Sequence, residues 1–453
     1  MRVVIDSKTS RWNVPDKRFS GDAMKLVNSR LIVCVLTVLT SSFAVADDWP
    51  QWGGPQRDLV WREEGIVKQF STDGMLPRMW STPIAAGYSG PAVADGKVFI
   101  TDRVQEEELE RVHCLDAETG KILWTHSYRT RYTISYPAGP RATPTVDGDR
   151  VYSLGAEGDL LCLNVADGKV IWSKQFKSDF GTRMPIWGMA GAPLVDGEQL
   201  IVLVGGADDA LLVSFDKQTG KELWRSLDDP EVGYAPPLKM TFGGKEQIVL
   251  WHPSAISAVD PATGEHLWSV PFRIRAGLTA PNPRQQGNRL FVSAFYNGPM
   301  MIEVAENGLS AQTLWKGKSD SELNPNGIHA IICTPVFTPT HVYGVSSFGQ
   351  LVCQEAATGK ILWESREATG KDRWWNAFIV PHEDRYFIPN EQGDLIIAEL
   401  SPEGYKEISR AKLIEPTRKV RRRMTIWSHP AFAVKSVFAR NDNEIIRVDL
   451  SAE

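Results

Sequence analysis

The chain has 453 residues, of which 42% are hydrophobic and 23% charged, a composition typical of globular proteins. The formal net charge of -5 argues against a generally basic nucleic-acid binder, so we expect no nucleic-acid partner. A chain of this length exceeds what one compact core holds, which favours a repeat array or a ring.

The first 46 residues are interpreted as a dispensable stretch followed by a signal peptide. Residues 1–23 are polar and without pattern, which favours Met24 as the start of translation. A basic start, an apolar run over 31–39 and an Ala-x-Ala site ending at Ala46 follow. The run is too short for a comfortable membrane-spanning helix. We predict cleavage after Ala46 and export to the periplasm or the cell exterior, with no transmembrane segment in the mature chain.

Residues 47–79 form an N-terminal extension that contains Trp49, Trp52 and Trp61 but has little hydrophobic periodicity. We predict that it packs over the side or bottom of the domain that follows. A ligand-stacking role for Trp52 is left open.

From residue 80 onward the chain repeats one phrase, in which a turn ends in Gly and is followed by Lys or Glu, two further residues and Trp. The clearest copies are Thr119–Trp124, Asp167–Trp172, Thr219–Trp224, Thr263–Trp268 and Thr358–Trp363. Eight residues before each Trp stands an acid or Asn, which we interpret as a turn-forming residue. Because each unit of such a repeat buries its apolar face only against its neighbours, the period determines the architecture.

Each unit also contains a tight turn between two strands before the phrase, and the hairpin signal is clearest at Asp95-Gly96 and Asp147-Gly148. Four short strands per unit and no helices are typical of a propeller blade. The repeat Trp recurs every 44 to 52 residues, and we expect its ring to lie between neighbouring blades. Counting the units predicts an all-β, eight-bladed β-propeller of four-stranded antiparallel blades over residues 80–453.

The two ends of the repeat region are incomplete in complementary ways. The last unit stops at Leu450 without a fourth strand, whereas Arg78-Met79-Trp80 is a fourth strand with no blade before it. We predict that this N-terminal strand completes the last blade and closes the ring, which removes exposed strand edges.

Four cysteines remain after the predicted cleavage, and three of them lie ten residues before a repeat Trp. Other copies have Ser214 or Ala258 at that position, so we interpret these cysteines as small packing residues and expect no disulfide framework.

The phrase Asp-x-x-Thr-Gly-Lys-x-x-Trp resembles the repeat of pyrroloquinoline-quinone (PQQ)-type propellers. That superfamily includes quinoprotein alcohol dehydrogenases and the outer-membrane assembly lipoprotein of the β-barrel assembly machinery. The opening Trp49–Pro55 is similar to the start of a class of exported bacterial propellers. The resemblance implies the fold, and it implies either a scaffold role or quinone-dependent oxidation.

Quinoprotein dehydrogenases hold PQQ beneath a disulfide between adjacent cysteines and bind calcium through acidic and amide side chains. This sequence has no adjacent cysteines, and other catalytic motifs are missing from it as well. We therefore predict no catalytic residue, no metal site and no cofactor, with PQQ and calcium expected only under the alternative function.

The loops that join each Trp strand to the next unit carry net positive charge, although the whole chain is acidic. The run Arg418–Arg423 is the largest contributor, and aromatic residues share these loops. One interpretation is a solvated face. The other is a face that binds an anionic ligand or an acidic protein, because guanidinium groups pair with carboxylate or phosphate. The candidate binding residues are Arg131, Arg141, Arg183, Trp187, Arg275, His329, Trp375, Arg422, Trp427 and His429.

These observations lead to one main hypothesis, that the chain is an exported, monomeric, non-catalytic binding or scaffold propeller of the cell envelope. Its partner would be an envelope protein or an anionic ligand. The first alternative is a PQQ-dependent oxidoreductase, and the second is a carbohydrate-binding or carbohydrate-processing propeller.

Overall fold

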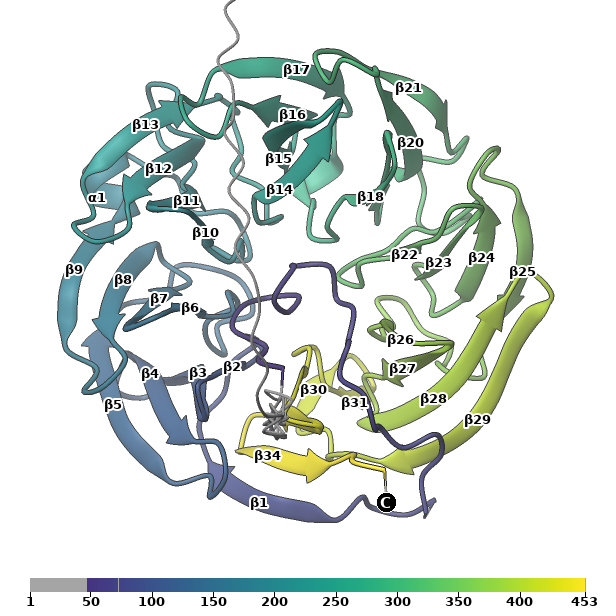
Figure 1. Ribbon diagram of the computed structural model, residues 1–453, viewed down its shortest axis with the longest axis horizontal. Coiled ribbons are helices and arrows are strands. Elements are labelled where there is room, and N and C mark those ends of the chain that lie inside the picture. The colour runs from purple at the N-terminus through teal and green to yellow at the C-terminus, as the bar shows by residue number, and fades with distance from the viewer. Residues whose placement is uncertain (1–46, 72, 453) are drawn as a thin grey trace, which may run out of the picture. The chain divides into compact units, whose positions relative to one another are not determined.

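The computed structural model describes residues 47–71 and 73–452 and confirms an all-β, eight-bladed propeller (Figure 1). The predicted signal peptide and the Met24 start lie outside the described residues. The described chain contains one short helix, α1 (Phe176–Phe180), and one 3-10 turn, Arg275–Gly277. No helix in this part of the chain is long and apolar enough to cross a membrane.

The first four blades follow one another along the chain, each with four antiparallel strands ordered from the centre outward. Blade 1 contains β2 (Ala92–Ala94), β3 (Lys97–Val104), β4 (Leu109–Asp116) and β5 (Ile122–Arg129). Blade 2 contains β6 (Thr145–Asp147), β7 (Arg150–Leu154), β8 (Asp159–Asn164) and β9 (Val170–Gln175). Blade 3 contains β10 (Leu194–Asp196), β11 (Gln199–Leu203), β12 (Leu212–Asp216) and β13 (Glu222–Ser226). Blade 4 contains β14 (Leu238–Phe242), β15 (Lys245–His252), β16 (Ala255–Val259) and β17 (His266–Pro271).

The remaining blades continue the same order, apart from an added hairpin before the last one. Blade 5 contains β18 (Arg284–Gln286), β19 (Arg289–Ala294), β20 (Gly298–Val304) and β21 (Ala311–Lys316). Blade 6 contains β22 (Val336–Phe337), β23 (His341–Val345), β24 (Leu351–Glu355) and β25 (Ile361–Ser365). Blade 7 contains β26 (Val380–His382), β27 (Arg385–Pro389), β28 (Asp394–Ser401) and β29 (Gly404–Lys412). Blade 8 contains β32 (Ala431–Ala433), β33 (Ser436–Arg440), β34 (Glu444–Asp449) and β1 (Arg78–Pro83), and the hairpin is β30 (Arg418–Val420) with β31 (Arg423–Thr425).

The N-terminal strand closes the ring, as predicted. β1 pairs antiparallel with β34, and Arg78 Nη1 lies 2.7 Å from Glu444 Oε2 across this pair. The Trp80 indole reaches into blade 1, where its Nε1 donates to the Ala117 carbonyl at 2.9 Å. Blade 8 is therefore built from both ends of the propeller, and Trp80 connects it to blade 1 as the other repeat tryptophans connect their blades.

Gly and Trp of the repeated phrase contact different neighbours, which explains why they recur together. A Cβ atom built on Gly120, Gly168, Gly220, Gly264 or Gly359 would lie 2.5–2.7 Å from the ring of a Trp in the preceding blade. Each of these glycines has φ between +69° and +73°, where L side chains are strained. The Trp Nε1 then donates to a backbone carbonyl of the same turn, for example Trp124 to Val165 at 2.8 Å. Each Trp thus packs onto the Gly of the next blade.

The acids before the phrase form turns, in line with the structural interpretation. Asp116 Oδ1 accepts hydrogen bonds from the backbone N–H groups of Glu118 at 3.1 Å and Thr119 at 2.7 Å. Asp216 and Asp260 make the same bonds in blades 3 and 4. Side-chain acceptors of this kind stabilise tight turns.

The four described cysteines, Cys114, Cys162, Cys333 and Cys353, are buried free thiols. Burial raises the pKa of Cys114 to about 12, so this thiol stays protonated and unreactive. Their position agrees with the packing role.

The N-terminal extension crosses the centre of the ring before it reaches the outer edge (Figure 1). Trp49 pairs with Val93 of β2, and Trp61 is buried with its ring centroid 5.0 Å from that of Phe432. Only the later part follows the side of blades 7 and 8, where Met75 pairs with Lys412. The predicted packing over the side therefore describes this later part, whereas the first part fills the central channel.

Candidate functional site

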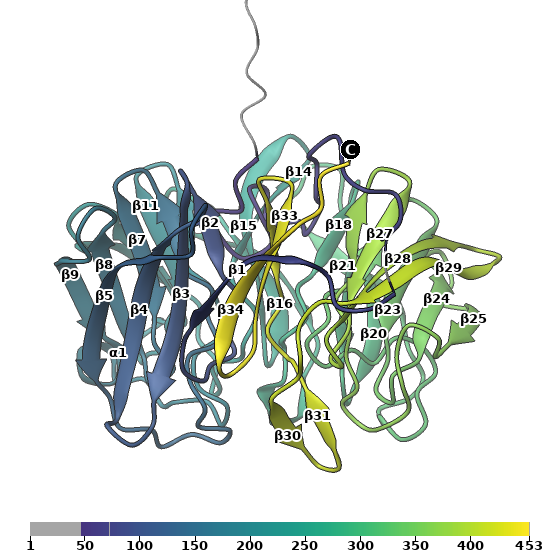
Figure 2. The same ribbon diagram turned by 90° about the horizontal axis from the view of Figure 1, so that it is seen from below.

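The eight connections between blades converge on one cavity of about 260 Å³ at the propeller axis. Every connection contributes at least one residue to its wall, and Trp52 and Leu59 of the extension complete it. The β30–β31 hairpin marks the face on which these connections lie, opposite the face where the extension enters (Figure 2). The site is therefore a product of the whole ring.

The wall of the cavity is mainly aromatic. Its nine aromatic side chains are Trp52, Tyr88, Tyr136, Trp187, Tyr234, Tyr296, Trp374, Phe378 and Trp427. Several of them contact one another: the Tyr136 and Trp427 ring centroids lie 6.1 Å apart, and those of Trp187 and Tyr234 lie 5.6 Å apart. Such tilted pairs hold the rings in place and leave the remaining ring surface facing the cavity.

Arg141 is the one cationic side chain in the wall, and it is used to hold its own loop. Its Nη2 donates to the carbonyls of Ser135 at 3.0 Å and Tyr136 at 2.6 Å, and its Nη1 donates to Gly139. Burial lowers its pKa. The guanidinium also lies over the Tyr88 ring at 5.0 Å, so most of its interactions are made inside the protein.

His429, Asn282 and Thr334 are further polar residues of the wall, and the first two differ in how well they are paired. His429 Nε2 lies 3.1 Å from Thr143 Oγ1, and burial lowers the pKa of His429 to about 4, so the ring is neutral near pH 7. Asn282 is 2% exposed, and neither atom of its side-chain amide has a partner among the described residues. Both atoms are closed off from the open space of the cavity, and a buried amide without partners is unfavourable for the fold.

The structure brings four of the ten predicted binding residues to the cavity: Arg141, Trp187, Trp427 and His429. Trp427 is positioned by its Nε1, which donates to Glu391 Oε2 at 3.0 Å. Arg275 lies at the edge, with its guanidinium 5.2 Å from the centroid of the wall residue Tyr296.

The other five predicted residues do not line the cavity. Arg131, Arg183 and Arg422 are exposed on the connections and form no ion pair with the described residues. His329 is buried, with Nδ1 3.1 Å from the Phe295 carbonyl, and Trp375 is buried in the core between blades 6 and 7. These last two side chains lie within the packed ring.

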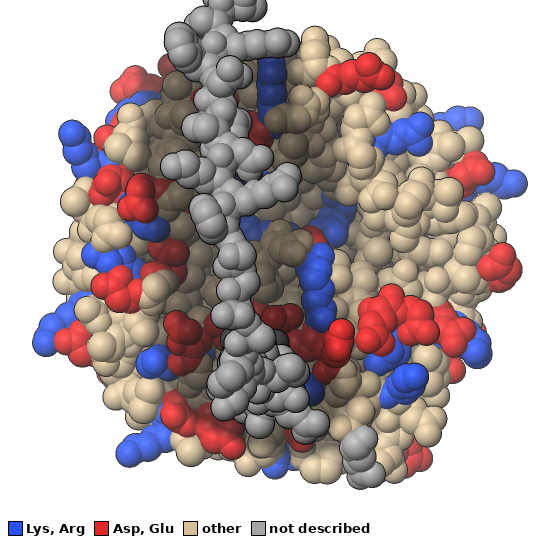
Figure 3. Space-filling model, in the orientation of Figure 1, with Lys and Arg blue, Asp and Glu red and all other residues tan. Residues whose placement is uncertain are grey.

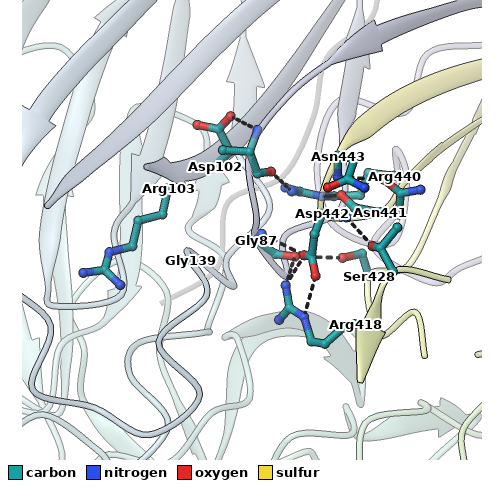
Figure 4. A network of polar contacts seen from close by, with 12 residues as sticks. Gly87, Asp102, Arg103, Gly139, Arg418, Ser428, Arg440, Asn441, Asp442 and Asn443 are labelled. Carbon is teal, nitrogen blue, oxygen red and sulfur yellow. Dashed lines mark hydrogen bonds and ion pairs between the residues drawn. The ribbon is translucent and has the colours of Figure 1, made fainter. Parts of the chain in front are cut away.

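Much of the predicted basic run is neutralised within the protein. Arg418 pairs with Asp442 of blade 8 and lies over the Tyr88 ring at 3.8 Å, within the polar network that joins blades 8 and 1 (Figure 4). Arg423 pairs with the buried Glu391 and lies 2.9 Å from Asp372. Lys419, Arg421 and Arg422 are the exposed basic residues of the run, and Arg421 Nε also lies 3.6 Å from Asp372 Oδ1.

The sequence patterns missed Tyr88, Tyr234, Phe378 and Asn282. A positional signal was available, because these residues precede the first residue of an innermost strand by two or four positions. His429 and Thr334 occupy the same kind of position in other blades. Alignment of the innermost strands would have identified them.

The resemblance to quinoproteins implies PQQ with calcium, and the cavity does not fit this pair. Its wall contains no carboxylate, whereas Ca²⁺ in proteins is held by several oxygen ligands that include carboxylates. No group of three or more His, Cys, Asp and Glu side chains within the described residues could hold a metal ion. We therefore derive no oxidation step for this site.

The profile of a family described as "Outer membrane protein assembly factor BamB" matches residues 60–126 and 108–334. The protein of that name from Burkholderia pseudomallei is 26% identical over 261 residues, which is 53% of this chain and 61% of the relative. The one from Shewanella oneidensis is 23% identical over 331 residues, which is 67% of this chain and 79% of the relative.

Quinoprotein dehydrogenases are matched over a shorter region. The quinoprotein ethanol dehydrogenase of Pseudomonas aeruginosa is 30% identical over 142 residues, which is 29% of this chain. This chain spans about a fifth (21%) of that relative's length.

Solved structures share the fold at low sequence identity. BamB from Moraxella catarrhalis superposes with a TM-score of 0.54 at 15% identity, over 83% of this chain and 99% of that one. A europium-containing methanol dehydrogenase superposes with a TM-score of 0.58 at 12% identity, over 89% of each chain. Both likenesses concern the fold alone.

Proposed function

Since the chain belongs to the family described as outer membrane protein assembly factor BamB, we propose that it is an exported scaffold that binds an envelope protein. The relatives of that name support a partner in outer-membrane protein assembly. The proposed docking face is the rim formed by the connections between blades, around the mouth of the aromatic cavity. Export, the scaffold role and the identity of the face are parts of this proposal.

The choice of this docking face rests on one observation. Exposed apolar side chains and arginines without an ion pair among the described residues occur together on the connections between blades. Ile186 is 53% exposed and Leu323 63% exposed, and both lie in connections between blades. Arg131, Arg183 and Arg422 lie on the same kind of loop. Exposed apolar groups mixed with arginine around a hollow are typical of protein-binding surfaces.

The charge of the rim favours an acidic partner. Three unpaired guanidinium groups would speed encounter with a negatively charged surface, and salt would slow that encounter. On the opposite face, acidic and basic side chains are interspersed around the ring (Figure 3). The rim is thus the better docking face for an acidic envelope protein.

The experiment is capture of partners from envelope extracts with the purified mature protein, followed by cross-linking and mass spectrometry. The test variant is the triple change Arg131→Glu, Arg183→Glu and Arg422→Glu. The matched control changes the exposed repeat residues Lys121, Lys221 and Lys360 to Glu, because these lie in turns on the opposite face. We expect the rim variant to lose the partner and the control to retain it.

Two results would overturn this function. One is capture of the same envelope proteins by wild type and rim variant alike. The other is stoichiometric uptake of PQQ with calcium, followed by dye-linked oxidation of an alcohol, which would favour the oxidoreductase alternative.

A further inference from the structure

The central cavity has the size and lining of a receptor for a single aromatic ring. Its volume is about 260 Å³, and nine of the side chains in its wall are aromatic. An apolar cavity of roughly 150 Å³ already accepts benzene, so this space accommodates a phenol or an indole. Edge-to-face contacts with the surrounding rings would then be available on several sides.

The polar groups of the wall argue against two other ligand classes. A sugar carries a hydroxyl group on most carbons, whereas Arg141, Asn282, Thr334 and His429 are the polar residues of the wall besides its Tyr and Trp side chains. Arg141 and His429 already have partners within the protein. A cationic ligand is disfavoured because the guanidinium of Arg141 lies in the wall and no carboxylate there offsets its charge.

Guanidinium groups lie over the aromatic wall itself. Arg275 lies 5.2 Å from the Tyr296 centroid, and Arg421 lies 5.7 Å from that of Trp374. Both arginines are exposed and belong to the rim, where Arg421 Nε also lies 3.6 Å from Asp372 Oδ1. Acidic groups beside an inserted ring would therefore meet positive charge at the edge of the cavity.

The size of the cavity distinguishes between kinds of ring. Benzene already fits a cavity of roughly 150 Å³. The volume of about 260 Å³ leaves room for the second ring of an indole, which also meets more of the aromatic wall than a phenyl ring does. An indole is therefore the ring that fills this cavity best.

From these observations, and resting on the proposed function, we propose that the cavity receives a tryptophan side chain of the partner protein, flanked in the partner's sequence by acidic residues. The aromatic wall holds the ring and the rim arginines pair with the flanking carboxylates. Binding is by insertion, without a covalent step.

The test uses blocked, fluorescein-labelled pentapeptides and the purified mature protein. The probe is Asp-Glu-Trp-Glu-Asp, and the comparison peptides replace Trp by Phe or by Ala, or replace all four acids by Lys. Fluorescence anisotropy gives the dissociation constants. We expect the Trp peptide to bind at least about tenfold more tightly than the Ala peptide, and the Lys peptide to bind weakly.

Protein variants locate the binding. Ala280→Phe fills the cavity from its wall and should abolish the preference for Trp over Ala. Ala138→Phe is the matched control, because Ala138 is half-buried in a connection but does not line the cavity. Thermal unfolding of each variant shows that it is folded.

The outcomes separate this inference from the proposed function. Equal affinity for the Trp and Ala peptides, or an unchanged preference in folded Ala280→Phe, would refute the insertion of a ring. If envelope capture then still depends on the rim arginines, the scaffold function stands without it. If the Trp peptide binds in the cavity but no envelope protein is captured, the scaffold function is refuted and the ring preference stands.

Discussion

The contact that closes the propeller can be tested by adding a single methyl group. Gly96 and Gly120 both belong to blade 1, and their φ angles are +69° and +70°. Alanine at either position incurs the same left-handed backbone strain of about 1–2 kcal/mol. A Cβ on Gly96 meets nothing within 4 Å, whereas one on Gly120 would lie 2.6 Å from the Trp80 ring. The pair therefore isolates the contacts that Gly120 makes with β1, namely those with the Trp80 ring and with Thr82 Oγ1, which would lie 2.8 Å from the added Cβ.

The added methyl of Gly120→Ala must displace the indole that connects blade 8 to blade 1. Overpacking of this kind costs about 1–3 kcal/mol. Displacement also weakens the bond from Trp80 Nε1 to the Ala117 carbonyl, at a cost of about 1 kcal/mol. We expect Gly96→Ala to lower the free energy of unfolding by about 1–2 kcal/mol and Gly120→Ala by about 3–6 kcal/mol.

Urea unfolding monitored by far-ultraviolet circular dichroism provides the measurement. Gly168→Ala, whose Cβ would lie 2.5 Å from Trp124, repeats the contact between two interior blades. A loss like that of Gly120→Ala would show that closure uses the same contact as the rest of the ring. Equal losses for Gly96→Ala and Gly120→Ala would refute the proposed packing of Trp80 onto the glycine.

Three further predictions concern single groups. Burial lowers the pKa of His429 to about 4, so protonation favours the unfolded chain. Stability should then fall by up to about 3 kcal/mol as pH decreases from about 6.5 to 4, and His429→Gln should remove this loss in urea titrations at the two pH values. Asp102 is buried between Arg111 and His113, at 2.6 and 3.0 Å, so Asp102→Asn should cost about 3–5 kcal/mol in the same assay. The control is Asp149→Asn, because Asp149 is exposed and pairs with Arg150 at the surface. This change should lower the free energy of unfolding by less than about 1 kcal/mol. Expression of the full chain in a bacterium should yield a protein whose Edman sequence begins at Asp47, and an intact N-terminus would contradict cleavage after Ala46.

Prediction of the candidate site from the sequence was only partly successful, for a physical reason. The run Arg418–Arg423 looked like a free basic patch because its partners, Asp442, Glu391 and Asp372, are distant in sequence. Burial of those carboxylates next to guanidinium groups depends on how blades 7 and 8 meet. Trp427 was identified from its loop. Its hydrogen bond to Glu391, however, joins the connection before blade 8 to blade 7, and the sequence does not indicate that contact.

The sequence by itself determined the architecture, because the interactions behind it are local and recur with a fixed period. Three residues of the repeat specify both the blade and its neighbour. They are an Asp whose side chain accepts hydrogen bonds in the turn, a Gly with positive φ, and a Trp that packs against the Gly of the next unit. The incomplete first and last units determined how the ring closes. Only the tertiary structure decided which side chains meet at the axis. The cavity draws residues from all eight connections and from an extension that crosses the channel, and no local pattern encodes that convergence.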